Sequence, residues 1–226
     1  MKIQIAIYCR IIAFFIVAMV LVSGYLPETC KAQTSNVESL DNIKKIGVLP
    51  FLKGRYGNEV RATLDANISN FNYKPEVISE EADRILTGIV HEEIKGKGVS
   101  DVVPLLEAVI AYDSISKEGE TIRSLAKKVG ETLKVDTMVV GYIWRYKRRV
   151  GSSVSASSPA SVGFCVCLVD VSTGNVLWKG SYEETQRSLS ENILNIKAFF
   201  KKGAKWLTAE DLARYGVKDI FKKYPH

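Results

Sequence analysis

The sequence predicts an α+β fold, an α/β sandwich in which helices pack on a mixed, largely antiparallel sheet, preceded by an export signal. Two apolar runs rich in β-branched residues, Val162–Val171 and Val176–Tyr182, are joined by a turn that is long enough for a hairpin and too short for a parallel crossover. Thr121–Val135 instead repeats apolar residues at the three- and four-residue spacing of an amphipathic helix. The chain therefore combines a hairpin with helices that each have one apolar face.

The amino end has the three parts of a secretory signal. Lys2 and Arg10 supply positive charge, Ile11–Val22 is uninterrupted and apolar, and Ser23–Ala32 is polar and ends in small residues. At about twelve residues, the apolar run is shorter than the roughly 20 residues that a membrane-spanning helix needs. We expect residues 1–32 to be a cleaved signal peptide, which places the protein where ATP, nicotinamide cofactors and genomic DNA are scarce.

Two other fates of the amino end stay open. Cys30 is a candidate for lipidation, which would make the protein a lipoprotein, but Pro27, Glu28 and Thr29 stand where a lipobox needs Leu and small residues. An uncleaved anchor would extend the apolar run back through Tyr8 and Cys9.

Composition indicates one mildly basic domain. The chain carries a net charge of +6, of which residues 1–32 account for +2, so the exported part of about 194 residues keeps about +4. Such a charge suits anionic cell-wall polymers or lipid head groups, and it is equally that of an ordinary soluble surface. We expect a flexible tether at 33–44 and a single domain at 45–226 whose segment 183–226 is a carboxy-terminal helical extension.

The elements of that domain follow from local patterns. Lys45–Phe51 has the composition of a strand, and Thr137–Tyr146 that of a central strand. Gly151–Ser161 is expected to be a small-residue loop, and Gly174 to supply the positive φ of the hairpin turn. The remaining helices are expected at Asn58–Phe71, Glu80–Lys95, Val102–Ala111, Ser188–Phe200 and from a cap at Thr208, with Asp211 completing the capping box.

Metal and cofactor chemistry have no support in the residues. Cys165 and Cys167 are two apart in a predicted strand, where the Cα separation is at the edge of disulfide reach, so buried free thiols are expected. The histidines His91 and His226 have no partners at metal-ligand spacing. We therefore predict no metal ion and no cofactor.

Catalytic signatures are also missing, and no catalytic residue is predicted. His91 and Glu92 begin like a zinc-protease helix, but Lys95 occupies the place of the second histidine. The alternative to a non-enzymatic protein is a cell-wall hydrolase or transferase that uses Glu183, Glu184 or Glu191 as its acid and base. Because neighbouring residues of a strand face opposite sides, Glu183 and Glu184 are not expected to flank one bond.

The densest basic feature is Arg145–Arg149, with Trp144 directly before it and Tyr146 within it. Aromatic and arginine side chains dominate the energetics of interfaces, so we predict partner binding by Trp144, Tyr146, Arg148 and Arg149. Export makes an envelope protein or an anionic cell-wall or membrane component a better partner than nucleic acid. The alternative is that these charges protect a sheet edge from unwanted pairing.

Three motifs occur in an order that resembles a known group of proteins. They are VLPF at Val48–Phe51, VVGYI at Val139–Ile143, and LVDVSTGNVLW at Leu168–Trp178. This order resembles the envelope α/β domain family of the curli-secretion lipoprotein CsgG, the LpoB-type activators of penicillin-binding proteins and the amino-terminal domain of TolB.

The resemblance implies a non-enzymatic exported protein, periplasmic or associated with the outer membrane. Such a protein would bind another envelope component and assist its assembly or regulation. Homo-oligomers are a further expected form of the protein. Gly151–Ser161 is too short and too polar for the membrane hairpins of a secretion pore.

Overall fold

A computed structural model describes residues 43–54, 77–97, 99, 101–115, 121–153, 155–186 and 206–224. All of them belong to one compact unit, Gln33–His226. Several predicted features lie outside the described residues: the export signal 1–32 with Cys30, the helices Asn58–Phe71 and Ser188–Phe200, and Glu191. They stay predictions.

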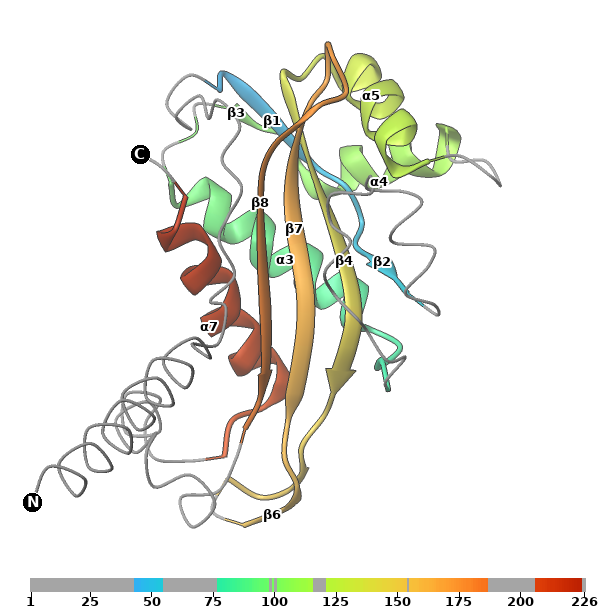
Figure 1. Ribbon diagram of the computed structural model, residues 1–226. Coiled ribbons are helices and arrows are strands. Elements are labelled where there is room, and N and C mark those ends of the chain that lie inside the picture. The colour runs from blue at the N-terminus through green and yellow to red at the C-terminus, as the bar shows by residue number, and fades with distance from the viewer. Residues whose placement is uncertain are drawn as a thin grey trace, which may run out of the picture. The chain divides into compact units, whose positions relative to one another are not determined.

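Among the described residues, six strands form one mixed sheet (Figure 1). They are β1 (Lys45–Val48), β2 (Leu52–Lys53), β3 (Asp101–Val102), β4 (Thr137–Lys147), β7 (Ser161–Asp170) and β8 (Val176–Thr185). The order is β3-β1-β4-β7-β8, and β2 also pairs with β4. Pairing is parallel from β3 to β4 and antiparallel from β4 to β8, which confirms the predicted antiparallel strands and their shared sheet with Lys45–Phe51.

The turn between β7 and β8 is built by local hydrogen bonds. Gly174 has φ of +75°, as predicted for the hairpin glycine. The Asp170 carboxylate accepts hydrogen bonds from the Ser172 hydroxyl at 2.7 Å and from the Thr173 backbone N–H at 2.6 Å. Burial opposes the ionisation of Asp170, but these hydrogen bonds outweigh it and hold the pKa of the carboxyl below its usual range. The hairpin is therefore fixed by its own sequence.

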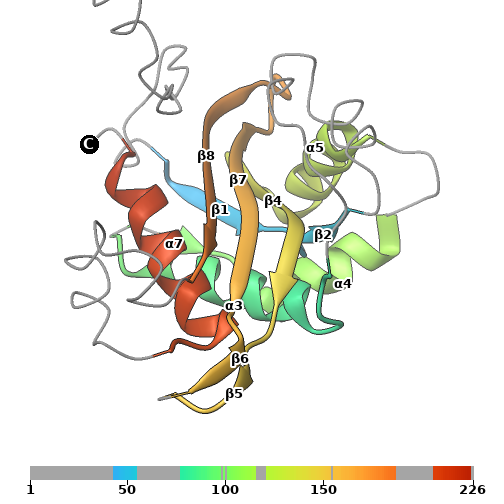
Figure 2. The ribbon, with the colours of Figure 1, turned by 60° about the horizontal axis from the view of Figure 1, so that its bottom comes forward.

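The segment between β4 and β7 is more ordered than predicted. Instead of a plain loop at Gly151–Ser161, β5 (Val150–Gly151) and β6 (Ala156–Ser158) form a small antiparallel sheet (Figure 2). Gly151 has φ of +109°, a backbone conformation that only glycine adopts without strain, and this allows the tight return. Gly151 is thus part of a short ribbon rather than of a loop.

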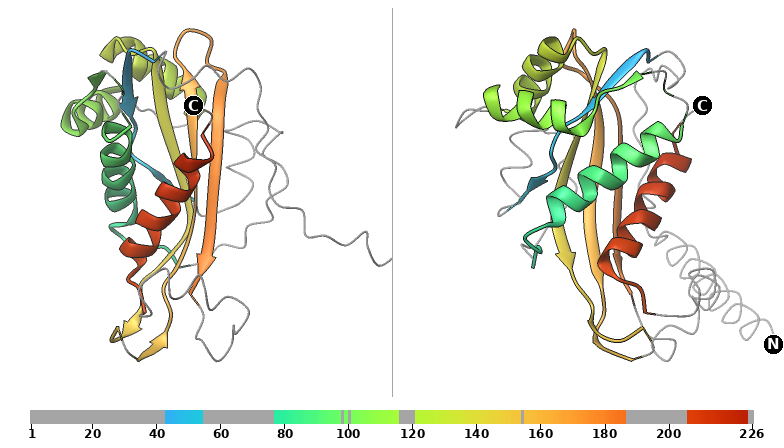
Figure 3. Two further views of the ribbon diagram at one scale, coloured as in Figure 1. Left: turned by 90° about the vertical axis from the view of Figure 1, so that its left-hand side faces the viewer. Right: turned by 180° about the vertical axis from the view of Figure 1, so that it is seen from behind.

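Four described helices cover the sheet on both faces (Figure 3). They are α3 (Ala82–Lys95), α4 (Leu105–Ile115), α5 (Ile122–Leu133) and α7 (Ala209–Lys222). α3 and α7 share one hydrophobic core with the sheet, and α4 and α5 share the other. The predicted sandwich of helices on a mixed sheet is confirmed.

Helix boundaries follow from capping groups and from a proline. The Thr208 side chain accepts from the Asp211 backbone N–H at 3.1 Å, and the Asp211 carboxylate accepts from the Thr208 N–H at 3.1 Å, which confirms the predicted capping box of α7. The predicted helix Val102–Ala111 is wrong at its start, because Val102 ends β3 and α4 begins only at Leu105. Pro104 disfavours helical geometry in the residue before it but is tolerated at a helix start.

A bulge in β4 places Trp144 and Tyr146 on opposite faces of the sheet, whereas residues two apart in a regular strand share one face. The pairing of β4 with β7 shifts register between Ile143 and Arg145. Trp144 consequently lies in the core beneath α4 and α5, whereas Tyr146 lies in the opposite core with α3 and α7. A bulge inserts one extra residue and so reverses the alternation of faces beyond it.

The two ends of the described chain are part of the core. Ile43, inside the predicted tether 33–44, is buried, so the fold begins about two residues earlier than predicted. Within the predicted extension 183–226, Glu183–Thr185 continue β8, and α7 buries Leu212, Val217, Ile220 and Phe221 against the sheet. Cys165 and Cys167 are free and buried, as predicted.

Candidate binding site at the end of strand β4

The basic run Arg145–Arg149 does not form a single patch. Arg145 is buried, and its Nη2 atom lies 2.7 Å from the Glu183 carboxylate. The two residues sit on β4 and β8, on either side of Gly163 of β7, which has no side chain to separate them. Arg145 is therefore a structural cation, while Arg148 and Arg149 lie beyond the end of β4.

Two of the four predicted contact residues are core residues. Trp144 is 4% exposed and Tyr146 is 1% exposed, so neither ring presents a surface to a partner. The bulge of β4 and the helices on both faces bury them, and sequence alternation alone does not reveal this. The edge-protection alternative does not apply to Arg145, since β4 lies in the middle of the six-stranded sheet, and for Arg148 and Arg149, which lie beyond that strand, it stays a prediction.

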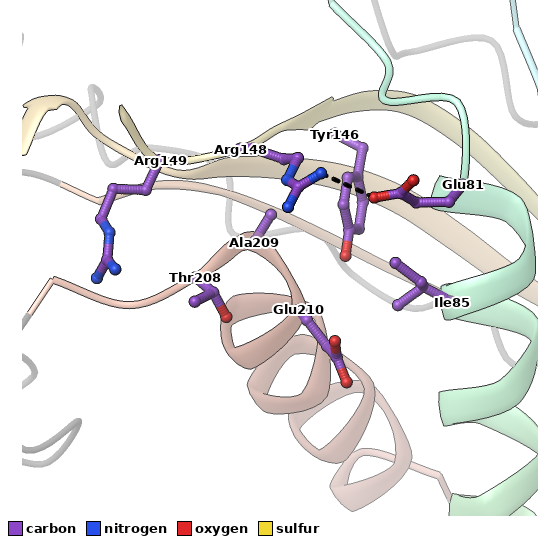
Figure 4. A pocket seen from close by; sticks show the side chains of 8 residues that line it. All are labelled: Glu81, Ile85, Tyr146, Arg148, Arg149, Thr208, Ala209 and Glu210. Atoms are coloured by element: carbon purple, nitrogen blue, oxygen red, sulfur yellow. Dashed lines mark hydrogen bonds and ion pairs between the residues drawn. The ribbon is translucent and has the colours of Figure 1, made fainter. Parts of the chain in front are cut away.

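Arg148 and Arg149 border a cavity of about 300 Å³ (Figure 4). Its lining comes from the end of β4 and from the amino ends of α3 and α7: Glu81, Ile85, Tyr146, Arg148, Arg149, Thr208, Ala209 and Glu210. Three segments that are far apart in the sequence thus converge at one point. The cap at Thr208 was predicted, but its position next to the basic run was not.

The charged side chains that line the cavity all have partners. Arg148 Nη1 lies 2.9 Å from Glu81 Oε1, and this pair links the end of β4 to the start of α3. Arg149 donates a hydrogen bond to the Trp206 carbonyl, just before α7. Glu210 is bound by Arg214 at 3.1 Å. Because Arg148 is 71% exposed, its pair with Glu81 adds little stability and the guanidinium stays accessible.

The Tyr146 hydroxyl is the unusual group of this cavity. Its oxygen is buried, and no hydrogen-bond partner for it exists among the described residues. Figure 4 shows the hydroxyl end of the ring between Ile85 of α3 and the first turn of α7. Burial raises the pKa of this phenol well above its usual range, so the group stays protonated and can donate a hydrogen bond. A buried hydroxyl without a partner costs about 1–3 kcal/mol.

The acidic residues of the enzymatic alternative do not converge. Glu183 binds Arg145, and Glu184 accepts a hydrogen bond from the Tyr182 hydroxyl in the core with α3 and α7. Glu191 lies outside the described residues. The two described carboxylates therefore have separate structural partners and do not share a cleft.

Other candidate chemistry is also structural. His91 is buried and its Nε2 donates to the Val103 carbonyl at 3.0 Å, as a core histidine would. Within the described ranges, no three His, Cys, Asp or Glu side chains gather as a metal site requires. Of the helices that the structure describes, none is both long and apolar enough to cross a bilayer.

Comparison with known proteins gives a fold but no family. No family model matches the sequence, and no curated protein matches it. A methionine-substituted variant of the PelC dodecamer from Paraburkholderia phytofirmans has 12% identity and a TM-score of 0.50, over 87% of this chain and 100% of that chain. A PelC dodecamer from the same organism, in another crystal form, gives 12% identity and a TM-score of 0.48, over 85% and 94%. The LpoB carboxy-terminal domain from Escherichia coli gives 14% identity and a TM-score of 0.37, over 74% and 93%.

Of these three likenesses, the one to the substituted PelC variant reaches a TM-score of 0.50, and at 12% identity it establishes a shared fold. An LpoB domain is among the similar structures, at a TM-score of 0.37. The resemblance to CsgG and to TolB stays a prediction.

Proposed function

We propose that this chain is a non-enzymatic protein of the cell envelope that is exported by residues 1–32 and binds another envelope component. The contact surface would be the rim of the cavity at the end of β4, with Arg148 and Arg149 as its cations. One observation carries the proposal: two arginines stand over a cavity whose buried tyrosine hydroxyl has no partner among the described residues. Interfaces are rich in arginine, and the charges would steer an anionic partner.

Export is tested by the mass of the mature chain. We expect a protein that has lost about the first 32 residues, because the apolar run is too short to span a bilayer. Mass spectrometry of the chain isolated from cells distinguishes the alternatives. An intact Met1 would contradict cleavage, and a diacylglycerol adduct on Cys30 would establish a lipoprotein.

Binding is tested by reversing two charges. Arg148→Glu combined with Arg149→Glu is expected to weaken recovery of the partner by at least tenfold at low salt, because attraction to an anionic surface becomes repulsion. The fold should lose only about 1 kcal/mol, from one exposed ion pair and one hydrogen bond to a carbonyl. Co-purification at several salt concentrations and a thermal melt measure the two effects.

The matched control reverses two exposed lysines elsewhere, Lys128 on α5 and Lys218 on α7. It changes the net charge equally and should leave partner recovery unchanged. Equal losses for both double variants would mean that net charge, not this surface, governs binding.

Self-association is a second part of the proposal. The solved structures of similar fold include PelC dodecamers. We propose that this chain also forms homo-oligomers, and analytical ultracentrifugation of the purified chain would show a single monomeric species if it does not.

A further inference from the structure

We propose that the cavity at the end of β4 takes the carboxylate of an acidic side chain presented by the partner protein. This inference rests on the proposed function and names the chemical group that the cavity recognises. It is built on three groups of donors that line the cavity: the Tyr146 hydroxyl, the first turn of α7 and the two arginines. Figure 4 shows Arg148 beside the tyrosine and Arg149 pointing away from it.

The tyrosine supplies the first argument. A phenylalanine would fill the same apolar space against Ile85, so the hydroxyl adds nothing to packing. Its oxygen has no partner among the described residues, although Tyr146 is 1% exposed. Buried polar groups are almost always hydrogen-bonded, so this exception needs an explanation, and a ligand that completes the bond would supply one. Because the phenol stays protonated, the group it meets is an acceptor.

The amino end of α7 supplies the second argument. The capping box uses the backbone N–H groups of Thr208 and Asp211. Ala209 and Glu210 line the cavity, and within the described part of the chain their backbone N–H groups donate no backbone hydrogen bond. The first amides of a helix point out of its end, and the helix dipole favours an anion there.

The arginines supply the third argument and limit the charge of the ligand. Arg148 binds Glu81 and Arg149 binds the Trp206 carbonyl, and each bond uses one of several N–H donors of a guanidinium. The lining holds two arginines and two glutamates, Glu81 and Glu210, and so has no net charge. Because the lining has no net charge, it gives no net attraction to offset the larger desolvation cost of a doubly charged phosphate, so a singly charged carboxylate suits the site better.

The apolar part of the lining favours a protein over a sugar as the source of the carboxylate. Ile85 and Ala209 can pack against the methylene groups of a glutamate. Sugar acids are usually held by an exposed aromatic ring that stacks on the pyranose, but the Tyr146 ring is buried and cannot do so. An acidic side chain of a partner protein therefore fits the lining best.

The test uses the full chain, purified in a non-ionic detergent, and three probes: a short blocked peptide with one central glutamate, the same peptide with glutamine, and galacturonate. The glutamate peptide is expected to bind at least tenfold more tightly than either of the others, as measured by calorimetry. Tyr146→Phe is expected to weaken its binding about tenfold, the typical loss for one hydrogen bond to a charged group. Lys218→Gln, a control on the outer face of α7, should leave binding unchanged.

A second readout separates a ligand-binding hydroxyl from a structural one. Without any ligand, Tyr146→Phe should melt at the same or a higher temperature than the parent chain, since it removes an unpaired buried hydroxyl. A lower melting temperature, equal binding of the glutamate and glutamine peptides, tighter binding of galacturonate, or no binding of any probe would each overturn the inference. In any of these cases, the chain could still recover a partner from cells and lose it on Arg148→Glu with Arg149→Glu. The proposed function would then stand, and only the carboxylate as the recognised group would be refuted.

Discussion

Phe221→Ala is expected to lower the free energy of unfolding by about 3–5 kcal/mol, the usual cost of removing a large buried aromatic side chain. Phe221 is fully buried on α7, and its ring centroid lies 5.5 Å from that of Trp178 on β8. Tyr224 also packs on this indole, at 5.1 Å. The loss would loosen α7 and, with it, the first turn that lines the cavity.

Urea unfolding of the variant and of the parent chain measures this loss. Lys218→Ala, on the exposed face of the same helix, is the control and should change the stability by no more than about 0.5 kcal/mol. Equal free energies of unfolding for the two variants would contradict the packing of α7 into the core through Phe221.

Gly141→Val is expected to cost about 3 kcal/mol or more, at the upper end of the range for overpacking. A Cβ atom at position 141 would lie 2.2 Å from Phe51 Cζ and 2.3 Å from both Phe51 Cε atoms. Phe51 has little freedom to retreat, since it is buried and its backbone N–H donates to Thr87 Oγ1 on α3 at 3.0 Å. The clash therefore falls on a buried ring whose backbone is held in place.

The control for this variant is another glycine. A Cβ at Gly88 on α3 would meet nothing within 4 Å, so Gly88→Ala should stabilise the protein by up to about 1 kcal/mol. Combining Gly141→Val with Phe51→Leu should recover part of the loss, because the two side chains compete for one space. A thermal melt in which both glycine variants behave alike would contradict the packing of Phe51 on Gly141.

This contact also explains why the motifs VLPF and VVGYI occur together in one chain. Phe51 is the last residue of the first motif, and Gly141 is the centre of the second. The ring of one fills the space that the other leaves empty on the face of the sheet toward α3 and α7. The motifs thus report a packing requirement of the fold rather than an activity.

Features that are fixed within a few residues could be predicted from the sequence. The hairpin with Gly174 and the capping box of Thr208 and Asp211 each depend on hydrogen bonds or dihedral angles of neighbouring residues. The long strands β4 and β7 were also visible, since both faces of these strands are buried and their sequences are almost continuously apolar.

Features that depend on distant residues could not be predicted. The bulge between Ile143 and Arg145 sends Trp144 and Tyr146 into different cores, and no local residue type announces it. The Arg145–Glu183 pair spans three strands.

The candidate site shows the same limit. Its cavity joins residues from α3, β4 and α7, of which the sequence pointed only to those of the basic run and to the cap of α7. Arg148 and Arg149 stay candidates because their position beyond the strand leaves them at the surface, while the aromatic residues beside them became core.

Photo-crosslinking in intact cells would show whether the end of β4 contacts a partner. A photoreactive amino acid would replace Lys147, which is exposed next to Arg148, or Lys128 on α5 as the matched position on another surface. We expect an adduct with an envelope protein from position 147, its loss when Arg148→Glu and Arg149→Glu are added, and no such adduct from position 128. Adducts of the same kind from both positions, or an adduct from 128 with none from 147, would contradict a binding surface at the end of β4.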